Sequence, residues 1–154
     1  MKLVVLFILI SLSGSALACE DKEPCKLNAM EVFLPDVQRY PVPNVRIEKL
    51  IFQTESGDVN QKVSTDELNR LKEELNGISA KAFKESTTSF EVLIQFRLTP
   101  SSNVDFKMQT TGGEKEDGIL TSFYNAVSKI NRYQSIKDDV LVVFHYKITP
   151  TEMK

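Results

Sequence analysis

Hydrophobic and polar side chains alternate along three stretches in the second half of the chain. The pattern is that of β-strands with one buried and one solvated face. These stretches are Phe90–Leu98, Val104–Gln109 and Val140–Ile148. The turn-forming residues between the first two predict a hairpin. The third stretch is also apolar at Leu141 and Val143, so we expect it to be a central strand, paired antiparallel with one of the other two.

Apolar residues recur at helical spacing in two other segments. The first begins after Ser64, where Glu67 completes the pattern of a capping box, and Gly77 is its predicted end. Its apolar positions are Leu68, Leu71, Leu75 and Ile78. The second follows Gly112-Gly113 and has one apolar face, which is made by Ile119, Leu120, Phe123, Val127 and Ile130.

The first third of the chain is divided by its prolines. Val45–Thr54 is rich in β-branched and aromatic residues and predicts a strand. Residues 19–44 hold four of the six prolines, which favours an extended arm. Within it, Met30, Val32 and Leu34 either form a short strand or belong to a leader crossing the surface.

These elements together predict an α+β fold in one domain, residues 45–154. Its core is a small antiparallel sheet with the order strand, strand, helix, strand over residues 90–148, packed with two helices. The 136 residues that follow position 18 are enough for one domain with a proper core.

The N-terminus has the three parts of a secretory signal: Lys2, an apolar run over Leu3–Ile10, and small residues that end in Ala16-Leu17-Ala18. The apolar run is too short to span a membrane, which takes about 20 residues. Residues 1–18 are therefore predicted to be a cleaved signal peptide, and the mature protein is expected to begin at Cys19.

The two cysteines, Cys19 and Cys25, leave two alternatives open. Ala16-Leu17-Ala18-Cys19 resembles the lipobox of bacterial lipoproteins, which implies acylation of Cys19 and stable anchoring by more than one acyl chain. Without lipid, an oxidising compartment permits a Cys19–Cys25 disulfide, although so small a loop adds little stability. Two cysteines and one histidine do not complete a four-ligand metal site.

The charge balance argues against a nucleic-acid partner. Loss of Lys2 with the signal peptide leaves 18 basic side chains against 21 acidic ones, a net charge of −3. Basic and acidic residues are interspersed, unlike a nucleic-acid footprint or a basic membrane-binding segment.

Candidate catalytic groups are few. His145 is the only histidine, and no partner serine or cysteine stands out beside it. The acidic pairs Glu73-Glu74 and Asp138-Asp139 are interpreted as surface and turn residues. Glu114-Lys115-Glu116-Asp117 lacks the spacing of an EF-hand loop. We therefore expect no enzyme and no cofactor.

Residues 83–148 resemble the TonB/TolA C-terminal domain family. The resemblance comprises the strand Phe90–Leu98, a Thr-Pro turn, a second strand, Thr110-Thr111-Gly112 in place of a Ser-Ser-Gly break, a helix, and the closing strand with Val142-Val143-Phe144. The chain lacks the membrane helix and long spacer of the family's energy transducers. What the resemblance implies is a protein-binding platform that adds a partner strand to a sheet edge.

The sequence thus predicts a non-catalytic protein-binding accessory lipoprotein in the periplasm, held at the outer membrane by lipid on Cys19. The alternative location is soluble in the periplasm or secreted. The alternative function is an immunity or inhibitor protein, whose acidic surface would suit a basic toxin or enzyme.

Overall fold

The computed structural model describes residues 29–33, 42–54, 59–101 and 104–151, with only the backbone for 29–33. Strands and helices in this part of the chain confirm the predicted α+β class. In chain order they are β1 (Ala29–Phe33), β2 (Val45–Thr54), the short 3-10 helix η1 (Val59–Gln61), α1 (Thr65–Phe83), β3 (Phe90–Leu98), β4 (Asp105–Thr111), α2 (Asp117–Val127) and β5 (Val140–Ile148).

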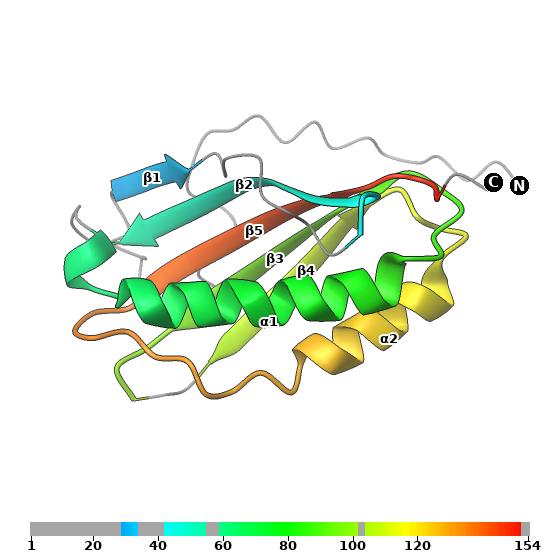
Figure 1. The fold of residues 1–154 in the computed structure, drawn as a ribbon. Helices are drawn as coiled ribbons and strands as arrows, with labels where there is room; N and C mark the ends of the chain where they lie inside the picture. The colour runs from blue at the N-terminus through cyan, green and yellow to red at the C-terminus, as the bar shows by residue number, and fades with distance from the viewer. Residues whose placement is uncertain (1–28, 34–41, 55–58, 102–103, 152–154) are drawn as a thin grey trace, which may run out of the picture.

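The five strands form one antiparallel sheet in the order β1-β2-β5-β3-β4 (Figure 1). β5 lies in the middle and pairs with β2 on one side and β3 on the other, which confirms its prediction as a central strand. β3 and β4 form the expected hairpin. Chain segments distant in sequence therefore meet at β5, and β1 and β4 are the two edges.

Part of the predicted arm belongs to this sheet. Of the two alternatives for this segment, the structure contains a strand over Ala29–Phe33, antiparallel to β2, whereas Leu34 lies outside the described residues. Ala29 lies opposite Thr54, and Phe33 lies opposite Leu50. The signal peptide, Cys19 and Cys25 lie outside the described residues.

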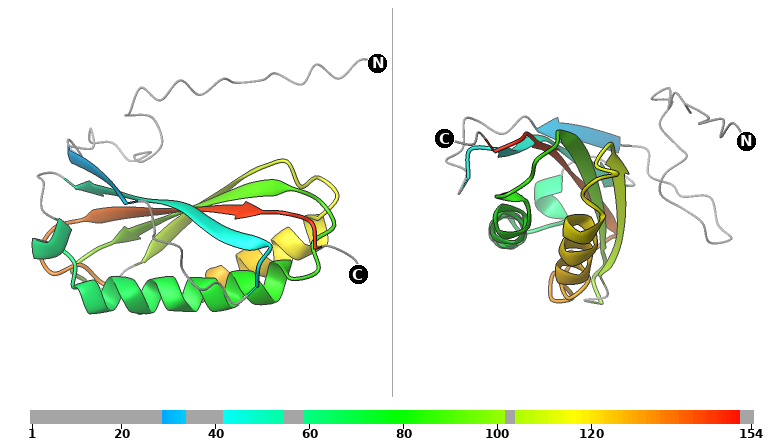
Figure 2. Two further views of the ribbon diagram at one scale, coloured as in Figure 1. Left: turned by 45° about the horizontal axis from the view of Figure 1, so that its top comes forward. Right: turned by 90° about the vertical axis from the view of Figure 1, so that its right-hand side faces the viewer.

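Both helices pack on the same face of the sheet (Figures 1 and 2). Between them and the sheet lies an aromatic core, in which the ring of Phe83 lies 4.6 Å from that of Phe123 and 5.4 Å from that of Phe90. All three side chains are buried, and burial of each such side chain stabilises the fold by about 1.5–3 kcal/mol. The alternating apolar residues of β3 and β5 are buried on this same face.

The predicted end of the first helix at Gly77 is wrong. α1 continues without a break to Phe83, and Gly77 is an exposed residue in its interior. Glycine inside a helix costs about 1 kcal/mol relative to alanine. The last turns of α1 outweigh that cost because Ala80 and Phe83 are buried in the core.

The predicted capping box is also absent. Ser64 is the N-cap residue, as expected, but its side chain makes no capping hydrogen bond. Glu67 does not reach back to it, because its Oε1 accepts a hydrogen bond from the backbone amide of Gln134, at 3.3 Å. A contact with the segment before β5 has replaced the local one.

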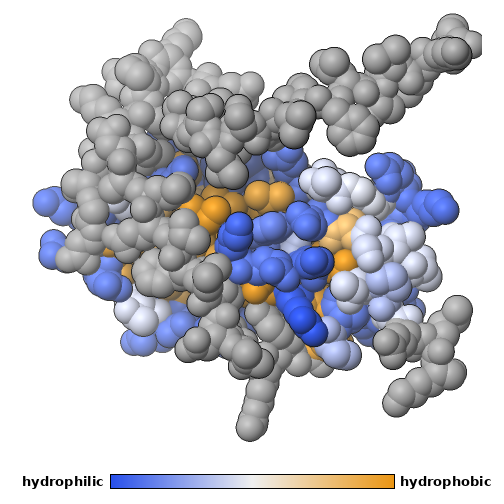
Figure 3. Space-filling model, turned by 90° about the horizontal axis from the view of Figure 1, so that it is seen from above, coloured by the Kyte–Doolittle hydropathy of each residue, from blue (hydrophilic) through white to orange (hydrophobic). Residues whose placement is uncertain are grey.

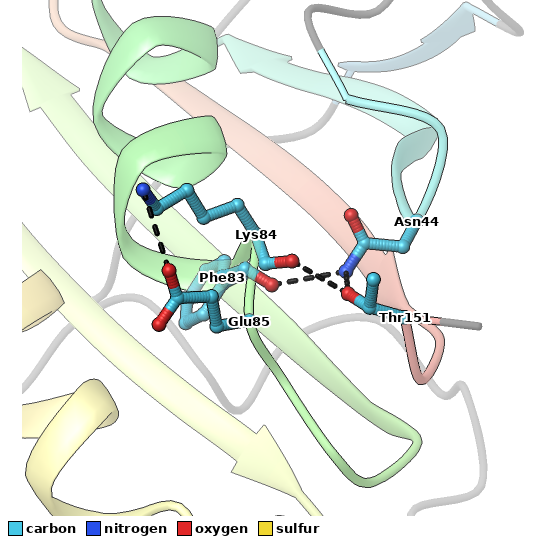
Figure 4. Close-up of polar contacts among 5 residues, drawn as sticks. All are labelled: Asn44, Phe83, Lys84, Glu85 and Thr151. Atoms are coloured by element: carbon cyan, nitrogen blue, oxygen red, sulfur yellow. Dashed lines mark hydrogen bonds and ion pairs between the residues drawn. The ribbon is translucent and has the colours of Figure 1, made fainter. Parts of the chain in front are cut away.

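A buried asparagine closes one end of the domain (Figure 4). Nδ2 of Asn44 donates to the carbonyl oxygens of Phe83 (2.9 Å) and Thr149 (3.2 Å) and to Oγ1 of Thr151 (3.2 Å). The Thr151 hydroxyl in turn donates to the carbonyl of Lys84. The start of β2, the end of α1 and the segment after β5 are thereby joined.

Candidate interaction surface at the β4 edge

The sole histidine lies on the face of the sheet opposite the helices. His145 of β5 is flanked by Leu93 of β3 and Lys49 of β2 in the strand register. Its Nε2 is 3.0 Å from Oε2 of Glu91, and its side chain is 19% exposed. This cross-strand contact is a structural pairing, and no nucleophile is recorded in contact with the ring among the described residues.

The two residues of the acidic pair Glu73-Glu74 have different surroundings. Glu73 is exposed on α1, as predicted. Oε2 of Glu74 accepts hydrogen bonds from Arg132 (2.8 Å) and from the hydroxyl of Tyr133 (2.7 Å). Burial, with the Glu74 contact, raises the pKa of Tyr133. Glu74 therefore joins α1 to the segment that follows α2.

The second acidic pair fixes the approach to β5. Oδ2 of Asp138 lies 2.6 Å from Nζ of the buried Lys62, and this hydrogen bond lowers the pKa of Asp138. Asp139 accepts two hydrogen bonds from Arg97 of β3, at 2.6 and 2.8 Å. Turn formation alone does not describe these residues, since both bind cations from distant segments.

The acidic residues before α2 include one unpredicted buried carboxylate. Oε1 of Glu116 accepts hydrogen bonds from the backbone amides of Thr87 (2.8 Å) and Thr88 (3.1 Å) and from the hydroxyls of Ser86, Thr87 and Thr88 (each 3.1 Å). The amide of Thr87 is the largest cause of a lowered Glu116 pKa, against an opposing effect of burial. Glu116 thus joins the start of α2 to the loop between α1 and β3.

β4 is an edge strand with one neighbour, β3, among the strands that the structure describes. Its residues alternate between half-buried Phe106, Met108 and Thr110 and the exposed residues between them. An edge strand presents backbone amides and carbonyls that a further strand can bind. β4 is therefore one of two strands, with β1, at which the described sheet offers backbone hydrogen-bonding groups to a further strand.

An exposed aromatic side chain lies beside this edge. α2 runs next to β4 in Figure 1 and in the right-hand view of Figure 2. From α2, Tyr124 places its ring 5.0 Å from that of Phe106, which lies 6.1 Å from the ring of the buried Phe96. Tyr124 is 45% exposed. Phe83 and Tyr133, by contrast, are buried.

Two glycines set where β4 ends. Gly112 and Gly113 have positive φ angles of 81° and 83°, a region that favours glycine. A Cβ on Gly113 would also lie 3.1 Å from Cγ of Phe90. The break between β4 and α2 at Gly112-Gly113 therefore has a steric cause.

Neither a metal-ion cluster nor a membrane-spanning helix is found in the described residues. No group of three or more histidine, cysteine, aspartate or glutamate side chains is arranged to hold a metal ion there. The helices found in the same part of the chain are too short or too polar to cross a membrane.

Comparison with protein-family models, with curated proteins and with solved structures finds no match to this chain. The resemblance to the TonB/TolA C-terminal domain therefore depends on the sequence pattern. The observed order β3-β4-α2-β5 confirms the predicted order strand, strand, helix, strand.

Proposed function

We propose that this chain is a non-catalytic accessory protein of the cell envelope that binds another protein by adding a strand of that partner to β4. In this proposal the mature chain is exported, is anchored by lipid on Cys19 and carries a TonB/TolA C-terminal-like domain. The observation that supports it most directly is the edge position of β4 beside a half-exposed aromatic ring.

In this proposal, the backbone groups at the edge of β4 provide the binding affinity. Strand addition depends on main-chain hydrogen bonds, and the side chains that alternate along the new strand supply specificity. A strand added to β4 would lie near α2, because the Phe106–Tyr124 contact holds α2 against this edge. The aromatic ring of Tyr124 would then lie beside the added strand.

In this proposal, Tyr124 is the main side-chain contact with the partner. Tyrosine is enriched among the residues that dominate binding energies, because it buries a large rigid ring and keeps a polar end. Its contact with Phe106 orients the ring before a partner arrives, which lowers the entropic cost of binding. An exposed tyrosine placed in this way is expected to be a hot spot.

The test is capture of the partner from envelope extracts by the mature domain, followed by measurement of its affinity for variants. Tyr124→Ala is expected to weaken binding by about 2 kcal/mol, roughly thirtyfold. Ile136→Ala is the matched control, since Ile136 is the other large apolar side chain that is exposed in the described residues, at 61%. Equal binding by the parent and by Tyr124→Ala contradicts the proposed site.

Proline substitution tests the backbone part of the proposal. Successive residues of a strand direct their amides alternately to one neighbour and to the other, so one of Met108→Pro and Gln109→Pro spares the β3–β4 hydrogen bonds. We expect that variant to keep the melting temperature of the parent and to lose the partner. Retained binding by both folded variants argues against strand addition.

Mass spectrometry of the mature N-terminus tests the anchor separately. A diacylglyceryl group on Cys19 is the expected result, and an unmodified Cys19 or a Cys19–Cys25 disulfide overturns the lipoprotein part. The captured protein distinguishes the two functions: an envelope component supports the accessory role, whereas a toxin or enzyme inhibited by the domain supports the immunity alternative.

A further inference from the structure

Basic side chains gather on the face of the sheet that the helices do not cover. The strand register of β2 shifts at the exposed Glu48. On either side of this shift, Arg46 of β2 lies opposite Lys147 of β5, and Lys49 lies opposite His145. These four residues, here called the basic patch, lie on adjacent strands that are about 4.8 Å apart. Arg46, Lys49 and Lys147 are exposed and His145 is half-buried.

The cations of the basic patch lack acidic partners in the described part of the chain. Arg46, Lys49 and Lys147 make no ion pair there. Glu91 lies opposite Lys147 on β3, but its carboxylate contacts His145 instead. Like charges directly opposite each other across two strands destabilise a sheet, so the Arg46–Lys147 pair is a local cost of this fold.

The net charge of the chain is negative, yet positive charges are opposed in the basic patch and destabilise the sheet locally. A local loss of stability of this kind is typical of a binding surface. Apolar residues border the basic patch: Leu93 is the β3 neighbour of His145, and Val143 and Ile51 are paired in the next row. All three are only half-buried. Figure 3, which views this side of the molecule, shows hydrophobic surface next to strongly hydrophilic surface.

We propose that the basic patch binds an acidic segment of a protein partner, with carboxylates against Arg46, Lys49 and Lys147 and an apolar side chain against Leu93 and Val143. This inference goes beyond strand addition at β4, because it uses a different face of the sheet. It rests on the proposed function only in taking the partner to be a protein.

The composition of this face favours a protein segment over an anionic membrane. Electrostatic binding to lipid takes clusters of about four to eight lysines and arginines, and the basic patch has three. The acidic residues Glu48 and Glu91 lie around it in the same sheet and confine its positive charge to a small area, which an extended anionic membrane does not match. A short acidic segment matches both the number of cations and their limited area.

The experiment is a titration of the intact mature protein with a polyglutamate peptide at low ionic strength, followed by NMR. We expect shifts confined to β2, β5 and β3 around the basic patch, and polylysine of equal length serves as the charge control. The double variant R46Q/K147Q should bind polyglutamate about tenfold more weakly, as the loss of two exposed charge contacts predicts. The matched control R70Q/K81Q removes the same charge from exposed positions of α1 and should bind like the parent.

Three binding results overturn the inference: equal affinity of R46Q/K147Q and the parent, an equal loss in R70Q/K81Q, or shifts produced by phosphatidylglycerol vesicles and not by polyglutamate. The variant is expected to fold, since removal of opposed like charges should leave the melting temperature unchanged or raise it. A lowered melting temperature would show that the pair is structural and would also overturn the inference. Binding at the basic patch is independent of Tyr124, so Y124A should bind polyglutamate normally even if the β4 proposal fails.

Discussion

At the scale of single residues, the polar groups with the most partners hold separate segments together. Glu116 and Asn44 are both buried. Glu116 contacts the loop residues 86–88, and Asn44 contacts both the end of α1 and the segment after β5. Loss of either would leave buried donors or acceptors without partners, which costs about 1–3 kcal/mol per group. Both residues therefore hold together the segments that meet near the C-terminal end of α1.

Glu116 gives the fold a defined response to acid. Its pKa is held below the ordinary value of 4.5 by the amide of Thr87, so the stability it contributes is complete above that value and is lost as the pH falls through the lowered pKa. We expect Glu116→Gln to reduce the free energy of unfolding by about 1–3 kcal/mol at neutral pH. The difference from the parent should shrink below pH 4.5.

Urea denaturation across this pH range provides the measurement. Glu114→Gln is the matched control, because Glu114 is exposed two residues away and should change stability little at any pH. A Glu116→Gln effect that is the same at neutral and acidic pH would mean that the carboxylate charge is not what stabilises the loop.

At the scale of elements, α1 shows how packing overrides a local stop signal. The helix passes through Gly77 because the apolar residues beyond it are buried against the sheet. By contrast, the chain does turn at Gly112, where φ is +81°. Only the backbone conformation distinguishes the two glycines.

Alanine substitution should therefore act in opposite directions at these glycines. Gly77→Ala is expected to raise the free energy of unfolding by about 0.5–1 kcal/mol, because its Cβ meets no atom within 4 Å. Gly112→Ala should lower it by roughly 1–2 kcal/mol, since alanine is strained at positive φ. Thermal denaturation of both variants checks the pair, and two changes of the same sign would contradict the helical environment assigned to Gly77.

At the scale of the whole molecule, the sheet order places β5 and β3 between neighbours and leaves β1 and β4 at the edges. Both helices also pack on one face of the sheet. The central strands are therefore protected from solvent both by neighbouring strands and by the helices. Core segments exchange their amide hydrogens only through the largest opening reactions. Stability is thus expected to fall from β5 toward each edge.

Native-state hydrogen exchange should show this gradient directly. Ladder amides of β5 and β3 are expected to exchange most slowly, near the limit set by global unfolding, and those of β4 and β1 much faster. Equal protection of β4 and β5 amides in the isolated domain would mean that the β4 edge is covered, and that result would argue against its use for strand addition.

The alternation of apolar residues by itself determined the strands Phe90–Leu98 and Val140–Ile148, β-branched and aromatic composition determined Val45–Thr54, and helical spacing determined both helices. These patterns can be recognised in the sequence because one face of each element is buried, whichever other element packs against it. The α+β class and the central position expected for the last strand followed from the same rule.

Only the tertiary structure decided what depends on neighbours remote in sequence. The pairing of β1 with β2, the passage of α1 through Gly77, the replacement of the Ser64–Glu67 capping box, the burial of Glu116 and the exposure of Tyr124 are all of this kind. The basic patch is too, because Arg46 and Lys147 are about 100 residues apart in sequence and meet only across β2 and β5. A local pattern shows which face of an element is buried, but sheet order and side-chain partners depend on contacts between elements.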